Sequence, residues 1–267
     1  MQSTLVLEIA TALKNYTVAD YSPFTNLEGV PLFVDPIIAV ADAADPLFSK
    51  MREPQAVGEL FLPPEEWLPD AKRVISFFLP FSDEVKHSNF VGNDPSPLWL
   101  LSRKESRSFV IHVSLQLQRY LESLGYTVVI PMLHPNYRAI EKNPTPGAPS
   151  FTSSWSERHI AYICGLGTFG LSKGIITSRG MAGRLGSIIT NAEIPVTPRP
   201  YQNLYDYCAH CGSCIHRCPV NAITLDGKKH LPCSDFLDDT KTRFAPHYGC
   251  GKCQVNVPCM DGIPTRD

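Results

Sequence analysis

The sequence predicts an α/β fold over roughly the first two hundred residues, followed by a smaller cysteine-rich module at the C-terminal end. Two observations support this division. Apolar patterns typical of a strand, a helix and a second strand follow one another in the first part, and eight of the nine cysteines lie after residue 207. With 267 residues, 43% of them hydrophobic, the chain is long enough to bury a substantial core.

Three short apolar runs predict the strands of the core. Residues 73–79 (RVISFFL) are rich in β-branched and aromatic side chains and stop at Pro80, which is typical of a buried strand. Residues 126–132 (YTVVIPM) predict a second strand, and residues 186–190 (GSIIT) form a further apolar run. Their order around an intervening helix predicts an α/β sandwich.

Two helices are predicted by apolar residues at helical spacing. The N-terminal segment 1–15 shows this spacing and predicts an amphipathic helix. A second helix is expected to begin at the capping box formed by Ser102 and Glu105, because each side chain can bond a free backbone N–H of the first turn. Gly125 is placed to cap the C-terminal end of this helix.

Proline-rich stretches punctuate the chain at two places. Three prolines fall between residues 195 and 200, so we place the domain change near residue 198, with residues 1–198 as the core and 199–267 as the cysteine module. The second stretch, residues 143–150 (NPTPGAPS), predicts a surface loop, and a lid over a site is the alternative.

The cysteine module contains the run CAHCGSCIHRCP at residues 208–219. This spacing, Cys-x2-Cys-x2-Cys-x3-Cys-Pro, is the bacterial ferredoxin pattern, in which three thiolates hold one 4Fe-4S cluster and the fourth ligates another. Cys208, Cys211 and Cys214 are therefore expected on one cluster, and Cys218 implies a second cluster.

Four further cysteines supply the thiols that two clusters still require: Cys233, Cys250, Cys253 and Cys259. Zinc is an alternative for the pair Cys250 and Cys253, but three evenly spaced cysteines with a trailing Cys-Pro do not suit one tetrahedral ion. A disulfide framework belongs to small secreted chains. Cys164 is left over as a ninth thiol.

The charge and hydropathy pattern excludes several classes of protein. Charged residues make up 19% of the chain and the net charge is -2, so no overall basic field attracts nucleic acid, although a local basic patch stays open. No apolar run approaches the ~20 residues that cross a bilayer, and the N-terminus lacks a positive signal region. We expect a soluble cytoplasmic protein without a membrane partner, whose oxygen-sensitive clusters favour anaerobic conditions.

A glycine motif, Gly165-x-Gly167-x-x-Gly170, has the spacing of a dinucleotide-binding fingerprint. That fingerprint must follow a strand and open a helix. Here the capping box formed by Ser154 and Glu157 predicts a helix before the glycines. The glycines therefore indicate a helix stop and a tight turn rather than a nicotinamide site.

Several motifs occur together in the second half of the chain: Glu157-Arg158, GLGTFG, RLGSIIT, CAHCGSCIHRCP and a later Cys-x2-Cys. In this combination the chain resembles the epoxyqueuosine reductase-like family, relatives of the reductive dehalogenases. The resemblance implies a nitroreductase-like core that holds cobalamin, and a ferredoxin-like domain with two 4Fe-4S clusters. Arg158, Gly165, Gly167 and Gly170 are then the expected corrinoid contacts, because small glycines let a backbone approach a large flat macrocycle.

The resemblance also implies how the thiols are shared between the clusters. One cluster is expected to bind the first three cysteines of the run and the last cysteine of the chain: Cys208, Cys211, Cys214 and Cys259. The other is expected to bind the remaining four: Cys218, Cys233, Cys250 and Cys253. Because the chain departs from the family spacing around Cys259, Cys164 is the rival for that ligand.

A second departure bears on the reaction. The aspartate that epoxyqueuosine reductases use as proton donor falls at Phe151, which cannot donate a proton. Tyr162, His159 and Glu157 are therefore the candidate catalytic residues, and we do not expect tRNA to be a partner.

Two functions remain open at this point. The first is a cobalamin-dependent reductase of a small molecule, in which two clusters receive electrons from a low-potential donor such as a ferredoxin or flavodoxin and pass them to the corrinoid. The second is a ferredoxin-type electron carrier that reduces a separate corrinoid or flavin partner protein. Cobalamin content distinguishes the two, because only the reductase must hold a corrinoid.

Overall fold

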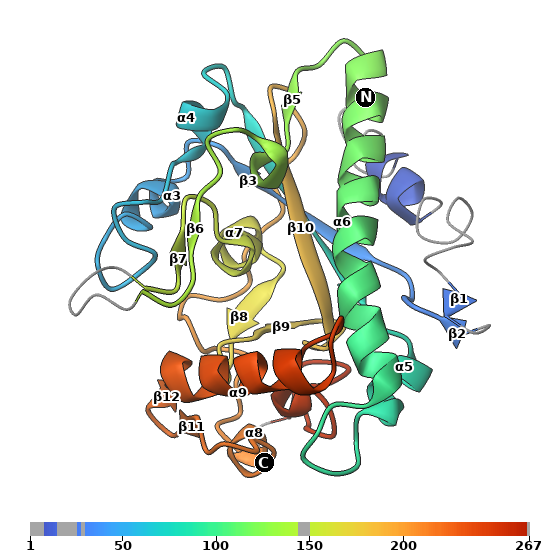
Figure 1. Cartoon of the computed structure of the whole chain (residues 1–267). Helices are drawn as coiled ribbons and strands as arrows, with labels where there is room; N and C mark the ends of the chain where they lie inside the picture. The colour runs from blue at the N-terminus through green and yellow to red at the C-terminus, as the bar shows by residue number, and fades with distance from the viewer. Residues whose placement is uncertain (1–7, 15–25, 28–29, 144–149, 266–267) are drawn as a thin grey trace.

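The protein is described by a computed structural model that covers residues 8–14, 26–27, 30–143 and 150–265. A central sheet carries one long helix along it, and the C-terminal cysteine module lies below the end of the sheet (Figure 1). The strands are β1 (Asn26–Leu27), β2 (Val30–Pro31), β3 (Ile37–Asp42), β4 (Arg73–Pro80), β5 (Val128–Val129), β6 (Ala139–Ile140), β7 (Thr152–Ser153), β8 (Gly167–Phe169), β9 (Ile175–Thr177), β10 (Gly183–Thr190), β11 (Ile223–Thr224) and β12 (Gly227–Lys228). The helices are α3 (Pro46–Lys50), α4 (Pro64–Trp67), α5 (Asp83–Ser88), α6 (Pro97–Ser123), η1 (Pro131–Leu133), α7 (Glu157–Cys164), α8 (Ser213–His216), α9 (His230–Arg243) and η2 (Lys252–Gln254).

The central sheet has the strand order β3-β4-β10-β5, and every neighbouring pair in it is antiparallel. The strands predicted at residues 73–79 and 186–190 are confirmed as β4 and β10. The predicted run at 126–132 is a strand only in β5 and continues as the short helix η1. The observed core is thus mixed α/β with an antiparallel sheet. The sequence did not predict the strand directions, because an apolar run indicates a strand but not the direction of its neighbours.

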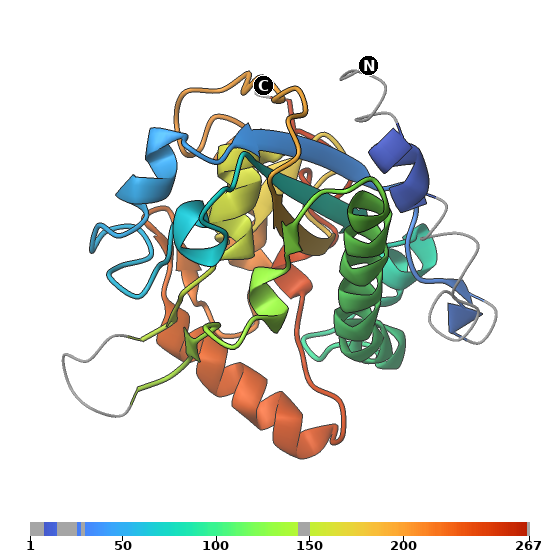
Figure 2. The same ribbon diagram turned by 90° about the horizontal axis from the view of Figure 1, so that it is seen from above.

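The two faces of the sheet are covered by different helices. Because successive strand residues point to opposite faces, Ile75 and Phe77 of β4 join the hydrophobic core under α6, whereas Val74 and Phe78 join the core under α7. Figure 2 shows α6 and α7 on opposite sides of the sheet. These two cores fix the ends of α7 and β10, from which the site described below is built.

Both predicted capping boxes are wrong. Helix α6 begins at Pro97 with Ser96 as its cap, since Ser96 Oγ accepts the Trp99 N–H at 3.1 Å, whereas Ser102 lies inside the helix. Ser154 Oγ accepts the Arg138 N–H at 2.9 Å and does not cap α7. In both cases the spacing matches a capping box, but the predicted serine does not cap the helix. Ser96 caps α6 instead, and the Ser154 hydroxyl is engaged in a tertiary contact with Arg138.

Other local predictions have mixed outcomes. Gly165 ends α7 in the left-handed conformation, as expected of a helix stop. Residues 8–14 are helical, which agrees with the N-terminal prediction for that part, and the rest of segment 1–15 lies outside the described residues. Residues 144–149 of the predicted loop lie outside them as well. None of the helices in the described part of the chain has the length and apolar character needed to cross a membrane.

The cysteine module packs closely against the core through the chain around η2. The Met181 N–H donates to the Cys259 carbonyl at 3.1 Å, and Asn89 Nδ2 donates to the Cys250 carbonyl at 2.9 Å. A Cβ atom built on Gly251 would lie 2.0 Å from the Trp99 ring, so only glycine lets the module backbone lie on this indole. The core therefore positions the last cysteines.

Candidate functional site

The structure gathers the module cysteines into two groups of four. Cys208, Cys211, Cys214 and Cys259 line a small pocket beside the turn that follows β8. Cys208 is buried, and Cys211 is exposed at the surface. The glycine Gly212, in the left-handed conformation, turns the chain into α8 between Cys211 and Cys214.

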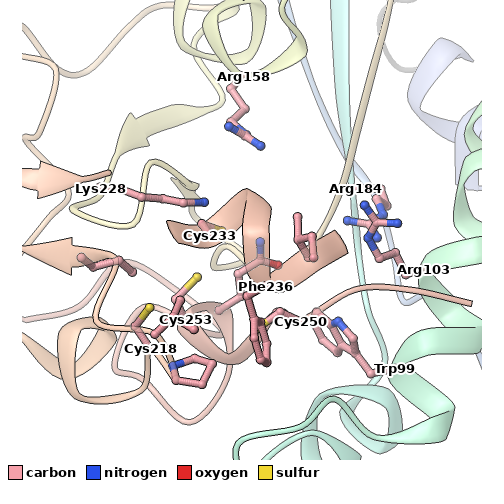
Figure 3. Close-up of a pocket in the computed structure, with 16 residues that line it drawn as sticks. Trp99, Arg103, Arg158, Arg184, Cys218, Lys228, Cys233, Phe236, Cys250 and Cys253 are labelled. Atoms are coloured by element: carbon pink, nitrogen blue, oxygen red, sulfur yellow. The ribbon is translucent and has the colours of Figure 1, made fainter. Parts of the chain in front are cut away.

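The other four cysteines, Cys218, Cys233, Cys250 and Cys253, line a second pocket of about 180 Å³ (Figure 3). Cys218 is close in sequence to the first group, yet its thiol faces the second pocket, where Cys233 from α9 and the two cysteines around η2 meet it. These groups coincide with the sharing of ligands that the family resemblance implies, and the ligand roles themselves stay a prediction.

Burial keeps the metal-free thiols of both groups protonated, so binding of a metal cluster must release protons. Burial raises the pKa of Cys250 to about 12 and that of Cys259 to about 12, so the metal-free thiols are protonated at neutral pH. A metal cluster would displace these protons, since thiolates are the ligands. In the described residues, no three His, Cys, Asp or Glu side chains come close enough to hold a single metal ion.

Cys164 lies apart from both groups, in the core between α7 and the sheet. Its side chain is fully buried, and its Sγ–H donates to the Val74 carbonyl at 3.4 Å. Burial raises the pKa of this thiol, and Cys164 is not among the residues that line either thiol pocket.

Three arginines line the second thiol pocket: Arg103 of α6, Arg158 of α7 and Arg184 of β10. Figure 3 shows Arg158 on one side of the hollow, Arg103 and Arg184 together on another, and the cysteines on a third. Burial, followed by the charges of Arg103 and Arg158, lowers the pKa of Arg184 to about 9. Positive charge is thus concentrated around the pocket that the second group of four cysteines lines.

Glu157 precedes Arg158 at the start of α7 and points toward the sheet. Its Oε2 accepts a hydrogen bond from Ser187 Oγ at 2.7 Å, and Ser187 Oγ accepts one from Trp155 Nε1 at 2.8 Å. Burial raises the pKa of Glu157 to about 7, and the Ser187 hydrogen bond opposes this rise. Glu157 is therefore a carboxyl group that can hold a proton at neutral pH.

The other two candidate catalytic residues are also held by contacts within the core. His159 Nδ1 lies 2.7 Å from Ser156 Oγ, and burial with the charges of Arg158 and Lys173 lowers the His159 pKa to about 4. Tyr162 packs between two aromatic rings, with centroids 6.3 Å from Phe169 and 5.2 Å from Tyr201. None of the three candidate catalytic residues, Glu157, His159 or Tyr162, is among the residues that line the second thiol pocket.

The three glycines expected to contact a corrinoid are packed against protein. A Cβ on Gly167 would lie 1.9 Å from the Ile176 carbonyl oxygen, and one on Gly170 would lie 3.2 Å from the Ile176 side chain. A Cβ on Gly165 would contact residues 197 and 198. These glycines shape the β8–β9 hairpin and the end of α7, and among the predicted corrinoid contacts Arg158 alone lines the second thiol pocket.

Phe151 connects the core to the cysteine module. It has a φ of 56°, and its ring stacks on that of His230 in α9 with centroids 5.0 Å apart. Lys142, from the same loop region, pairs with Asp235 and Asp238 of α9. Phe151, where the resemblance implies the family's proton donor, thus takes part in a contact between α9 and the core.

Comparison with known proteins adds a family context to this geometry. The 4Fe-4S binding domain family matches residues 204–224. A curated epoxyqueuosine reductase of Bacillus anthracis is 35% identical over 141 residues, which make up 46% of this chain and 35% of that protein. The chain resembles epoxyqueuosine reductases. The match spans about a third of the relative's length, so the activity and partners of the whole relative enter only as proposals.

Solved structures show the same fold. An epoxyqueuosine reductase bound to an epoxyqueuosine-modified tRNA-Tyr stem loop matches 99% of this chain and 68% of its own, with a TM-score of 0.55 and 18% identity. A reductive dehalogenase, described as B12-dependent, matches 99% of this chain and 37% of its own, with a TM-score of 0.55 and 13% identity. Resemblance to both groups was expected from the sequence, and the comparisons confirm it.

The expectation that tRNA is not a partner is wrong. The curated relatives are named epoxyqueuosine reductase, and one structural neighbour holds a tRNA stem loop. That expectation depended on Phe151 and on the net charge. Net charge averages over the whole surface, whereas binding depends on the local field, and three arginines meet at this pocket.

Several pocket residues were missed at the sequence level. Arg184 lies in the quoted motif RLGSIIT, and a charged residue in an otherwise apolar strand is a signal that could have singled it out. Gln254 also lines the pocket, and its Oε1 is buried without a hydrogen-bond partner. No sequence pattern distinguishes that glutamine from a surface residue.

Proposed function

We propose that this protein is an iron-sulfur reductase of the epoxyqueuosine type, which reduces a modified nucleoside of tRNA by means of two 4Fe-4S clusters and a bound corrinoid. The observation that carries the proposal is the second thiol pocket, where four cysteines open onto three arginines. The fold shared with a tRNA-bound relative supports the choice of substrate. We also propose that the α/β core is nitroreductase-like.

The two thiol groups fit two clusters. Each group contains four cysteines around its own pocket, and four thiolates are what one 4Fe-4S cluster requires. Such clusters supply single electrons at low potential, which a donor such as a ferredoxin or flavodoxin can provide. In this proposal electrons enter at the first group, where Cys211 is exposed, and leave from the second group, whose pocket the arginines line.

The residues around the second pocket fit a corrinoid in part. Arg158 reaches into the hollow, and the buried, unpartnered Oε1 of Gln254 is an acceptor for a donor such as a corrinoid amide group. The glycines do not contribute, because protein atoms already occupy the space beside them. A corrinoid supplies low-valent cobalt that attacks or reduces an electron-poor carbon.

The reaction consumes two electrons and two protons. The oxygen of an epoxide leaves as water when both of its carbon bonds break, and a carbon-carbon double bond forms in its place. We propose Glu157 as the source of a proton, since its pKa of about 7 leaves it partly protonated at neutral pH. His159 and Tyr162 rank below it, because His159 is neutral at that pH and Tyr162 packs in an aromatic cluster.

The decisive experiment supplies anaerobically reconstituted protein with cobalamin, a low-potential reductant and tRNA that contains epoxyqueuosine. The expected product is queuosine, detected by mass spectrometry of the nucleosides. Glu157→Gln is expected to lower the rate about 100-fold, because a positioned acid typically contributes that much. Reduced clusters with no corrinoid bound at micromolar cobalamin would contradict the proposal and favour an electron carrier.

A further inference from the structure

A second hollow adjoins the arginine-lined pocket and carries an unusual set of charges. It has a volume of about 300 Å³ and shares Arg103 and Arg184 with the thiol pocket. Seven residues line it, and we call it the basic pocket: Arg103, Lys104, Arg107, Arg184, Pro246, His247 and Tyr248. Four of the seven are cationic and none is acidic.

The cations come from two elements that the fold holds together. Arg107 lies four residues after Arg103 and three residues after Lys104 on α6, so it is a neighbour of both on the helix surface. Arg184 comes from β10 and is fixed by donating its Nε–H to Ser106 Oγ at 2.8 Å. Among the described residues, the ion pair that involves one of these cations is a long one, with Lys104 Nζ 3.9 Å from Glu105 Oε1.

Such a cluster is electrostatically unfavourable without an anion. Arg103 and Arg184 are partly buried, so solvent screens the repulsion between their charges incompletely, whereas Lys104 and Arg107 are exposed. Burial lowers the pKa of Arg184 most, and the charges of Arg103 and Arg158 lower it further. A bound anion would remove this repulsion.

The remaining lining residues add the features of a nucleic-acid contact. The guanidinium of Arg103 lies 3.8 Å from the centre of the Tyr248 ring, and Tyr248 is 37% exposed. The Nε2 atom of His247 is buried without a hydrogen-bond partner. A cation beside an exposed aromatic ring and an unused ring nitrogen is suited to a phosphate with a neighbouring base or sugar.

We propose that the basic pocket is a binding site for a phosphodiester group. Arginine and lysine side chains on one helix face provide charge-assisted donors for its oxygens, and Arg184 closes the site from the sheet. The inference rests on the proposed function for its ligand, because the RNA backbone and the nucleotide loop of a complete corrinoid both carry this group. Its place beside the thiol pocket lets one ligand occupy both.

The test uses the exposed residues Lys104 and Arg107, whose replacement by Gln should leave the fold intact. Arg119→Gln is the matched control, since Arg119 is also exposed on α6 but lies about 18 Å further along the helix. Each reconstituted protein is titrated with a fluorescent RNA stem loop over a series of salt concentrations. A parallel titration compares cobalamin with cobinamide, which lacks the nucleotide loop and its phosphate.

If the phosphodiester belongs to RNA, Arg107→Gln should weaken RNA binding about 5-fold to 10-fold. The slope of log binding constant against log salt concentration should fall by about 0.7 to 0.9, which corresponds to one lost phosphate contact. If the phosphodiester belongs to the corrinoid, the same variant should bind cobalamin more weakly, and its affinity for cobinamide should be unchanged. Arg119→Gln should bind every ligand as the wild type does. Equal loss of cobalamin and cobinamide, or no change with any ligand in Lys104→Gln and Arg107→Gln, would overturn the proposal.

A third measurement separates this inference from the proposed function. Inorganic phosphate alone should raise the thermal unfolding midpoint of the wild type and of Arg119→Gln more than that of Arg107→Gln, because a ligand stabilises the state that binds it. This difference is expected even if the protein fails to convert epoxyqueuosine. Equal stabilisation of all three proteins by phosphate would count against the site.

Discussion

Glu157 and Ser187 are joined by a 2.7 Å hydrogen bond between α7 and the central strand β10. The bond ties the first turn of the helix that carries Arg158 to the strand that carries Arg184. It therefore connects the two elements that supply Arg158 and Arg184 to the second thiol pocket, and it holds a carboxyl group whose pKa is about 7.

The pKa of Glu157 predicts a pH-dependent stability. Its folded pKa of about 7 exceeds the ordinary value of 4.5, so its stabilising contribution is present below about 4.5 and is lost as the pH rises through about 7. Glu157→Gln stays neutral and should be more stable than the wild type at pH 8, by on the order of 3 kcal/mol, and within about 1 kcal/mol of it at pH 5. Urea unfolding of both proteins at pH 5, 6, 7 and 8 checks this, and parallel curves would contradict it.

Iron analysis tests the two thiol groups. Protein reconstituted anaerobically should contain about eight irons per chain, as two 4Fe-4S clusters require. Cys211→Ala should retain about four, because Cys211 lies in one group only, and it should also weaken folding of the module. A sample that contains mainly zinc and lacks broad visible absorption would rule out the clusters.

The ninth thiol and the last ligand can be separated by a pair of variants. Cys164→Ser should leave the iron content unchanged, since Cys164 is buried under α7 and bonds to Val74. Cys259→Ser should lower it, since Cys259 lines the first thiol pocket. Iron and sulfide content, measured side by side, decide between them, and the reverse result would place Cys164 on a cluster.

Gly251 is predicted to be essential for docking the module on the core. Gly251→Ala adds a Cβ 2.0 Å from the Trp99 ring at a residue with a φ of 71°, so it should cost several kcal/mol. Gly92→Ala is the control, because Gly92 has a φ of 68° and open space around its Cβ position. It should cost only the backbone strain, about 1 kcal/mol. Similar thermal unfolding midpoints for the two variants would show that the contact with Trp99 is unimportant.

The sequence by itself determined the strands β4 and β10, the cysteine spacing and the resemblance to epoxyqueuosine reductases. Apolar runs, cysteine intervals and short motifs are local features, and they require no knowledge of which segments meet. The helix stop at Gly165 was accessible for the same reason. The net charge contributed to the wrong expectation that tRNA is not a partner, because a net charge carries no information on where the charged residues lie.

The tertiary structure alone decided the antiparallel strand order and the composition of the pockets. Arg103, Arg158 and Arg184 lie on three elements that are separate in the sequence. They line one pocket because α6 and α7 pack on opposite faces of the sheet that contains β10. The same packing buries Glu157 and raises its pKa. It also separates Cys218 from its neighbours in sequence, because the fold of the module turns its thiol toward α9.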